Sequence, residues 1–300
     1  LGKGLEMSSI LLEGADLLLR TDDCWSVLRR GYLGVRGRTI DYIGGDRPAT
    51  AYDVYKDLTG HLLMPGLYNA HTHTPMTLLR GLGSGLPLDR WLREAMFPVE
   101  ERLTPEDIRV GTELAMLEML ASGVVSFSDM YYMSEITADA VLAAGMKANL
   151  NRPILGFDRN EVYADSSRVV ESLRFYDGYN GAGDGSIRVD FAIHAEYTAH
   201  EGLVRPYAED CLSRGARMHL HLSETGKEHN ECKGRYGKTP ARWFLDLGVL
   251  DSPVNAAHCV WVEPEDLDIL QEKGVTCVHN PSSNMKLGSR SEEHTSELQS

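Results

Sequence analysis

The 300-residue sequence has few features that would favour a nucleic acid or a membrane as its partner. Its 30 lysines and arginines stand against 44 aspartates and glutamates, which gives a formal net charge of −14, and no basic stripe occurs. Phosphate groups and anionic membranes bind clustered Lys and Arg, so we expect neither as a partner. Long apolar runs are also missing, which argues against a signal peptide or a membrane span.

Cysteine is scarce as well. The five cysteines show no regular spacing, and this favours free thiols in a reducing cytoplasm. With 42% hydrophobic and 25% charged residues, the chain can bury enough core for one barrel-sized domain and a small accessory domain. The composition therefore predicts a soluble globular protein.

Two patterns of hydrophobicity divide the chain. Short alternating segments separated by glycines predict a small N-terminal β-sandwich domain over residues 1–64. From residue 62 onward, apolar runs rich in β-formers alternate with helical stretches such as residues 105–122, which predicts an α/β domain with a parallel sheet over residues 65–289. In that helix Ile108, Leu114, Leu117 and Leu120 recur near helical spacing. The candidate strands cover residues 62–69, 124–128, 147–152, 188–194, 216–221, 254–258 and 275–279.

Seven such strands indicate a (β/α)8 barrel of the TIM type that lacks one strand. Polar or ionisable residues follow nearly every strand, namely His71, His73, Asp129, Arg152, His194, His221, His258 and His279. In such a barrel this end of the strands carries the active site. For any one of these residues alone, a structural role at a strand end is favoured, because structural polar groups outnumber catalytic ones, and only their number favours a functional site.

The residues of this set with the most specific chemistry are His71 and His73. Residues two apart on a strand point to the same face, so both imidazoles can converge on one metal ion. His221 supplies a third imidazole, with Glu224 three residues later, where a carboxylate could carry protons beside a zinc-activated water. The signatures of helical metalloproteases, cytidine-type deaminases and P-loop proteins are absent.

Five segments together resemble the amidohydrolase superfamily, and within it the 5-methylthioadenosine / S-adenosylhomocysteine deaminases. They are residues 65–73 (PGLYNAHTH), 75–81 (PMTLLRG), 221–225 (HLSET), 257–259 (AHC) and 279–287 (HNPSSNMKL), and the resemblance runs from about residue 10 to 287. It implies hydrolytic deamination of adenine nucleosides such as S-adenosylhomocysteine, 5-methylthioadenosine and 5′-deoxyadenosine to the inosyl product and ammonia.

The resemblance also implies roles for residues of this chain. His71, His73 and His221 would ligate one divalent ion, zinc or else iron. Glu224 would protonate the purine ring nitrogen, while His258 would orient the hydrolytic water and stabilise charge on the adduct.

For the substrate, the resemblance implies that Trp91 contacts the nucleoside, that Glu100 binds the ribose hydroxyls and that His194 lies in the substrate site. Arg152 and Arg168 would face the amino-acid tail of S-adenosylhomocysteine, since a guanidinium suits a carboxylate. We interpret His219 as a histidine of the barrel interior and Asp129 as a structural carboxylate.

Two alternatives stay open. Another amidohydrolase, such as a guanine or 8-oxoguanine deaminase or a triazine chlorohydrolase, would use a similar metal site. A non-catalytic binding protein on a degenerate barrel is the alternative from a different class. The partner we expect is a small nucleoside, with a homo-oligomer as an additional possibility.

The sequence departs from the family pattern near its end. The family continues to an eighth strand whose aspartate bridges metal and water, and no such aspartate follows residue 289. Residues 290–300 resemble translated sequencing adapter, and residues 1–6 precede a candidate start at Met7. We therefore expect a chain truncated before strand eight with a non-native tail, poorly soluble because of its unpaired strand edges, and inactive by itself.

Overall fold

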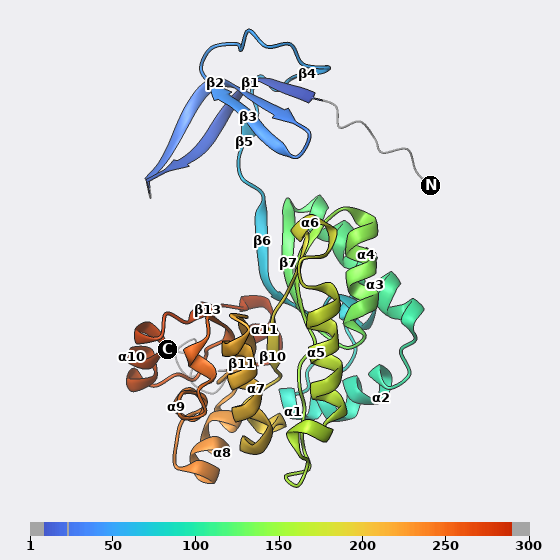
Figure 1. The fold of residues 1–300 in the computed structure, drawn as a ribbon, viewed down its shortest axis with the longest axis vertical. Coiled ribbons are helices and arrows are strands. Elements are labelled where there is room, and N and C mark those ends of the chain that lie inside the picture. The colour runs from blue at the N-terminus through green and yellow to red at the C-terminus, as the bar shows by residue number, and fades with distance from the viewer. Residues whose placement is uncertain (1–8, 23, 290–300) are drawn as a thin grey trace. The chain divides into compact units, whose positions relative to one another are not determined.

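The computed structural model describes residues 9–22 and 24–289 (Figure 1). The expectations for residues 1–6 and 290–300 lie outside these described residues. The chain divides into two compact units between Leu67 and Tyr68, three residues beyond the boundary predicted from the sequence. Each unit is described by itself.

The first unit is built on one sheet of five strands. In order along the chain they are β1 (Ser9–Thr21), β2 (Cys24–Arg36), β3 (Thr39–Gly44), β4 (Val54–Asp57) and β5 (Leu62–Leu63). The sheet order is β3-β2-β1-β4, and β5 also pairs with β1. Alternation along β1 buries Leu11, Ala15 and Leu17 on one face. A sandwich needs a second sheet, and the described residues of this unit contain none, so the predicted sandwich is not confirmed.

The second unit contains two sheets of four strands with orders β6-β7-β8-β9 and β10-β11-β12-β13. The strands are β6 (Leu67–Thr72), β7 (Val124–Met130), β8 (Lys147–Asn151), β9 (Ile187–Val189), β10 (Phe191–Ile193), β11 (Met218–Leu222), β12 (Val254–His258) and β13 (Thr276–Val278). The pairings from β7 to β9 and from β10 to β13 are parallel. The predicted α/β class with parallel strands is thus confirmed.

Two predicted strands differ from the observed ones. The segment predicted over residues 62–69 splits, because Pro65 has no N–H for a ladder; its first part, β5, pairs with β1 of the first unit, and β6 begins only at Leu67. The segment predicted over residues 188–194 is divided at Asp190. There the chain changes partner, since the Asp190 N–H donates to Leu150 and the next N–H, of Phe191, donates to Arg217.

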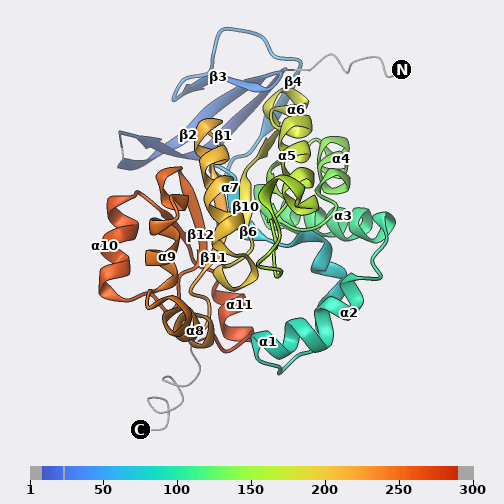
Figure 2. The same cartoon turned by 60° about the horizontal axis from the view of Figure 1, so that its bottom comes forward.

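Helices lie along the outside of these strands (Figure 2). They are α1 (Leu88–Arg90), α2 (Phe97–Glu100), α3 (Pro105–Ala121), α4 (Ser134–Ala144), α5 (Ser167–Tyr179), α6 (Ala182–Gly185), α7 (Glu201–Ser213), α8 (Gly226–Tyr236), α9 (Pro240–Asp246), α10 (Pro264–Glu272) and α11 (Pro281–Lys286). The short helix η1 (Thr74–Leu79) directly follows β6, and the π-helical segment η2 (Trp91–Met96) joins α1 to α2. No helix in the described part of the chain is both long enough and apolar enough to cross a membrane.

The predicted helix over residues 105–122 is confirmed as α3, but its buried face differs from the expected one. Ile108 is buried as predicted, whereas Leu114, Leu117 and Leu120 are exposed. Small residues such as Gly111 and Ala115 are buried instead, because α3 packs closely against η1 and α4. The helix begins after Thr104, whose hydroxyl accepts from the Asp107 N–H while the Asp107 carboxylate accepts from the Thr104 N–H.

Two apolar clusters support the strands of the second unit. One surrounds β10, β11 and β12 and includes Tyr207, Leu220 and Phe244, and the other surrounds β7, β8 and β9 and includes Phe127 and Phe175. These clusters lie between strands and helices, so the polar residues at the strand ends remain available for a site.

Candidate metal centre and active site

The structure brings three histidines from two strands together. His71 lies in β6, His73 follows that strand directly, and His221 lies in β11. One ligand nitrogen from each of the three lies within 4.8 Å of those of the other two, so this cluster could hold a metal ion. Three imidazoles are a donor set that suits zinc and leaves a coordination position open.

The outer nitrogen of each histidine is held by the protein. His73 Nδ1 lies 2.5 Å from the Met130 carbonyl oxygen, and His221 Nδ1 lies 2.7 Å from that of His194. A carbonyl only accepts, so Nδ1 carries the proton in both rings and Nε2 keeps its lone pair. His71 Nδ1 lies 2.9 Å from His219 Nε2.

Burial keeps these imidazoles neutral, which is the form that binds a metal. It lowers the pKa of His73, and burial together with the neighbouring histidines lowers the pKa of His71 and His221 well below the usual value. The residues present therefore fit a divalent ion in both geometry and protonation state.

A carboxyl group and a fourth imidazole lie next to this cluster. Glu224 follows β11, and burial raises its pKa to about 7. His258 ends β12, and its Nε2 lies 3.6 Å from Glu224 Oε2. Its Nδ1 lies 2.8 Å from Asn284 Oδ1, an acceptor, while burial lowers the pKa of His258 to about 4. His258 is thus neutral, with Nδ1 as donor and Nε2 as acceptor.

These groups line a cavity of about 640 Å³ in the second unit. Most of the residues that the sequence singled out lie in its wall: His71, His73, Trp91, Glu100, His194, His221, Glu224 and His258. Glu100 is half-buried, which raises its pKa, and it accepts a hydrogen bond of 2.7 Å from the Tyr131 hydroxyl. Trp91 Nε1 donates a hydrogen bond to the Leu82 carbonyl oxygen. Lys286 Nζ lies 5.3 Å from the centre of the Trp91 ring. Burial lowers the pKa of His194 to about 4.

The structure does not bring the two arginines into this wall. The guanidinium of Arg152 forms ion pairs with Glu135 and Glu171. Arg168 lies exposed at the beginning of α5. Neither residue belongs to the cavity lining.

His219 and Asp129 occupy supporting positions. His219 is fully buried, and its Nδ1 lies 3.2 Å from Ser128 Oγ, so it connects His71 to β7. Asp129 accepts a hydrogen bond of 2.5 Å from the Thr74 N–H, and burial raises its pKa to about 7. Both contacts agree with the structural roles inferred from the sequence.

Three further residues contact the predicted site residues and were not assigned from the sequence. Tyr131 contacts Glu100, Asn284 contacts His258, and Glu228 contacts the backbone of Glu224. Asn284 lies in the 279–287 segment, and Glu228 stands three residues after Thr225, the spacing of a helix capping box. Tyr131 has no such signal, because only folding places its hydroxyl beside Glu100.

Comparison with known proteins gives consistent matches over almost the whole chain. The amidohydrolase family model matches residues 62–299. A 5-methylthioadenosine/S-adenosylhomocysteine deaminase of Pelotomaculum thermopropionicum is 40% identical over 290 residues, covering 94% of this chain and 65% of the relative. A 5′-deoxyadenosine deaminase of Methanosarcina acetivorans is 38% identical over 283 residues, again 94% of this chain and 65% of the relative.

Among solved structures, an adenosine deaminase from Xanthomonas campestris with bound zinc aligns with a TM-score of 0.84 and 29% identity, covering 93% of this chain and 64% of the other. This chain therefore spans slightly less than two thirds of the length of these relatives. The family match covers more than half of the chain, including the three clustered histidines, and the chain belongs to the amidohydrolase family.

Proposed function

We propose that the full-length protein carrying this chain hydrolyses the exocyclic amino group of adenine nucleosides, with S-adenosylhomocysteine, 5-methylthioadenosine and 5′-deoxyadenosine as the substrate class. The observation that carries this proposal is the pairing of Glu224, whose pKa is raised to about 7, with neutral His258 at 3.6 Å beside three clustered imidazoles. The deaminase names of the relatives support the same class of reaction.

The metal we propose for His71, His73 and His221 is zinc, as in the Xanthomonas campestris structure, with iron as the alternative. A bound zinc ion supplies a Lewis acid that lowers the pKa of water toward neutrality. His71, His73 and His221 would hold it through the ring nitrogens that the protein leaves free, and a coordination position would remain for that chemistry.

Glu224 and His258 divide the proton transfers in this proposal. A carboxyl group with a pKa of about 7 is partly protonated at neutral pH, so Glu224 can donate a proton to a purine ring nitrogen. His258 Nε2 accepts a hydrogen bond from the attacking water, because Nδ1 donates to Asn284. The water oxygen then bonds to C6 as the water gives one proton to His258 Nε2, and this proton passes on to the amino nitrogen. The bond from C6 to that nitrogen breaks, ammonia leaves, and the second water proton returns to Glu224 as C6 becomes a carbonyl carbon.

The nucleoside would be held by other residues of the cavity wall. The Glu100 carboxylate, fixed by Tyr131, can accept hydrogen bonds from two ribose hydroxyls. Trp91 offers an apolar ring for the nucleoside. Because Arg152 is paired with two glutamates, we do not assign it to the amino-acid tail, and the proposal extends to nucleosides without a charged 5′ substituent.

A screen of ammonia release by the zinc-loaded full-length protein tests this function. S-adenosylhomocysteine, 5-methylthioadenosine, 5′-deoxyadenosine and adenosine are compared with guanine and 8-oxoguanine, and chloride release from a triazine is followed in parallel. We expect turnover of the adenine nucleosides only. Preferential turnover of guanine or a triazine would replace the proposal with the corresponding alternative, and binding without turnover would favour the non-catalytic one.

The same assay tests the role of Glu224. Glu224→Gln cannot donate the proton, so we expect turnover to fall by about 10² to 10⁴-fold while the metal content stays the same. The matched control is Glu209→Gln, the same change at an exposed position of α7, which should keep full turnover. Undiminished turnover in Glu224→Gln would remove the residue from the mechanism.

A further inference from the structure

Glu224 stands on a turn whose backbone is held in an uncommon conformation. Ser223, the residue before it, has φ = 47°, in the left-handed region that costs a residue with a side chain free energy. Such a conformation persists only where the surroundings determine it. The contacts of this turn therefore decide where Glu224 points.

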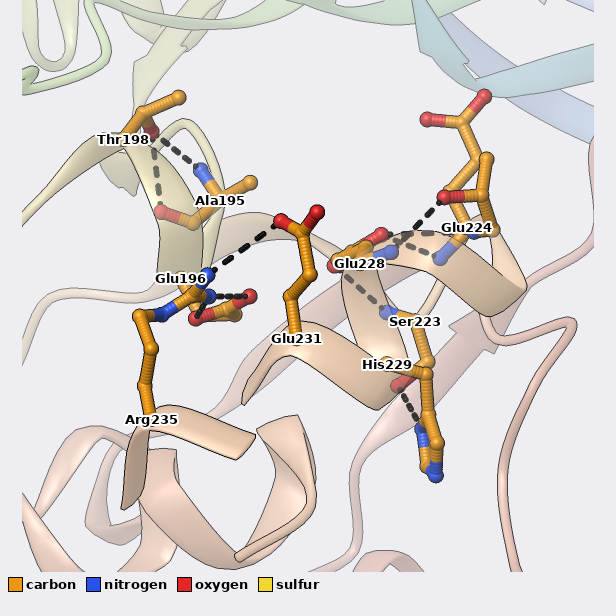
Figure 3. A network of polar contacts seen from close by, with 10 residues as sticks. Ala195, Glu196, Thr198, Ser223, Glu224, Glu228, His229, Glu231 and Arg235 are labelled. Atoms are coloured by element: carbon orange, nitrogen blue, oxygen red, sulfur yellow. Dashed lines mark hydrogen bonds and ion pairs between the residues drawn. The ribbon is translucent and has the colours of Figure 1, made fainter. Parts of the chain in front are cut away.

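The contacts come mainly from a second glutamate, Glu228, in the first turn of α8 (Figure 3). Its carboxylate accepts three backbone N–H groups, from Ser223 at 3.1 Å, from Glu224 at 2.8 Å and from Thr225 at 3.5 Å. Glu228 is only 5% exposed, and the positive end of the helix dipole lies at its position. Arg235, which Figure 3 also draws, pairs its guanidinium with Glu196 and Glu231.

The other sides of Ser223 are held as well. Its carbonyl oxygen accepts from the N–H groups of Val260 and Trp261 at 3.1 and 2.9 Å, beyond the end of β12. Its hydroxyl lies 3.3 Å from His229 Nδ1 of α8. The turn is thus fixed from β12 on one side and from α8 on the other.

Part of this arrangement is an ordinary helix cap. Thr225 and Glu228 form a capping box, in which the Thr225 hydroxyl accepts from the Glu228 N–H at 3.2 Å. In a capping box the Glu228 side chain also accepts a hydrogen bond from the N–H of the N-cap residue, Thr225. At 3.5 Å this is the longest of the three hydrogen bonds that Glu228 accepts. The two shorter bonds reach past the cap to Ser223 and Glu224, where a cap makes no contact.

We propose that Glu228 is a positioning residue for Glu224: its buried carboxylate binds the N–H groups of residues 223 and 224 and so directs the Glu224 side chain into the cavity. This inference rests on the proposed proton transfer by Glu224. Preorganisation of this kind matters because a displacement of about 1 Å at a reacting group can lower a rate by about 10²-fold.

The substitution Glu228→Asp distinguishes the proposed positioning of Glu224 from the capping of α8. The capping box of α3 has an aspartate in the same place, and Asp107 reaches the N–H of its N-cap residue at 2.8 Å. Glu228→Asp should therefore keep the cap but, being one methylene shorter, release residues 223 and 224. Glu228→Gln keeps the length but presents an amide donor to N–H groups that need an acceptor.

Steady-state kinetics of the zinc-loaded full-length protein provide the first measurement. For both variants we expect kcat to fall by about 10²-fold, with KM within about threefold and an unchanged zinc content. The matched control is Asp107→Asn, which removes the corresponding carboxylate from the cap of α3 and should leave kcat unchanged. A kcat within twofold of wild type in Glu228→Asp would overturn the proposal.

Amide hydrogen exchange provides the second measurement, and it does not depend on turnover. We expect exchange at residues 223 and 224 to rise by about tenfold or more in Glu228→Asp, while Thr225, whose N–H the cap still holds, and the strands of the second unit keep their protection. An unchanged rate at these residues would overturn the positioning, and so would a uniform rise along the chain. If Glu228→Gln does not fold, Glu228→Asp decides the question.

The two measurements also separate this inference from the proposed function. If wild-type protein deaminates no adenine nucleoside but exchange at residues 223 and 224 still rises in Glu228→Asp, the proposed function fails and the positioning of Glu224 stands. If wild type is active and Glu228→Asp equals it in kcat, the positioning fails and the function stands.

Discussion

At the scale of single residues, burial sets the protonation state of the site. Histidine is ordinarily half protonated near pH 6.5, and a carboxyl group is ordinarily ionised at neutral pH. Burial in the cavity disfavours the charged form of both side chains. It lowers the pKa of His258 to about 4, so the imidazole is neutral, and raises the pKa of Glu224 to about 7, so the carboxyl group is partly protonated at neutral pH. A neutral imidazole and a partly protonated carboxyl group then stand 3.6 Å apart.

The raised pKa of Glu224 predicts how stability depends on pH. Its pKa is about 7 in the folded protein and 4.5 as the ordinary value, so the folded state binds the proton more tightly. The contribution of protonated Glu224 to the unfolding free energy is therefore fully present below pH 4.5 and is lost as the pH rises through 7. Glu224→Gln cannot ionise and escapes this loss.

We therefore expect metal-free Glu224→Gln to gain up to about 3 kcal/mol in unfolding free energy relative to wild type across this pH interval, at about 1.4 kcal/mol per pKa unit. Urea denaturation at a series of pH values measures the difference. Glu209→Gln, at an exposed position, serves as the control. A difference that does not change with pH would contradict the assigned pKa.

At the scale of elements, the approach of α3 to η1 fixes the segment that follows His73. Gly111 of α3 lies so close to Pro75 that an added Cβ would stand 2.6 Å from the Pro75 carbonyl oxygen. Because the obstacle is backbone, no side chain can move to make room. Close packing without a side chain at residue 111 thus helps to hold the segment that follows His73.

This contact predicts that Gly111→Ala destabilises the protein, although alanine favours helices. We expect a loss of about 1 to 3 kcal/mol from the overpacked contact, together with weaker zinc binding. The control is Gly178→Ala in α5, where an added Cβ meets nothing within 4 Å, and it should gain about 0.5 to 1 kcal/mol. Thermal unfolding of both variants measures the difference, and a stabilised Gly111→Ala would show that the contact is not tight.

At the scale of the whole molecule, the candidate metal site joins the end of β6 to β11. Its histidines lie far apart in the chain, since His71 and His73 precede His221 by 150 and 148 residues. A ligand that binds only the folded state stabilises it by mass action. We expect zinc at a hundredfold excess over its dissociation constant to add about 2.7 kcal/mol to the unfolding free energy, and a chelator to remove it.

His221→Ala should abolish this zinc-dependent shift, since two histidines remain. His61→Ala, which changes an exposed histidine of the first unit, should retain it. Thermal unfolding with zinc and with chelator measures the shift. An equal shift in His221→Ala would place the metal elsewhere.

The sequence by itself determined the order of the strands in the second unit and, together with the family resemblance, several residues of the cavity wall. This was possible because strand periodicity and the position of polar residues after each strand are local properties. The bounds of β7, β8, β11, β12 and α3 differ from the predicted ranges by at most a few residues.

Only the tertiary structure decided which groups meet. It split the predicted first strand at Pro65, paired Arg152 with glutamates instead of leaving it in the cavity wall, and exposed Leu117 on α3. It also placed Glu228 under the turn that carries Glu224. Each of these outcomes depends on contacts between segments far apart in the chain or on the path of a turn, which hydrophobic patterns do not encode.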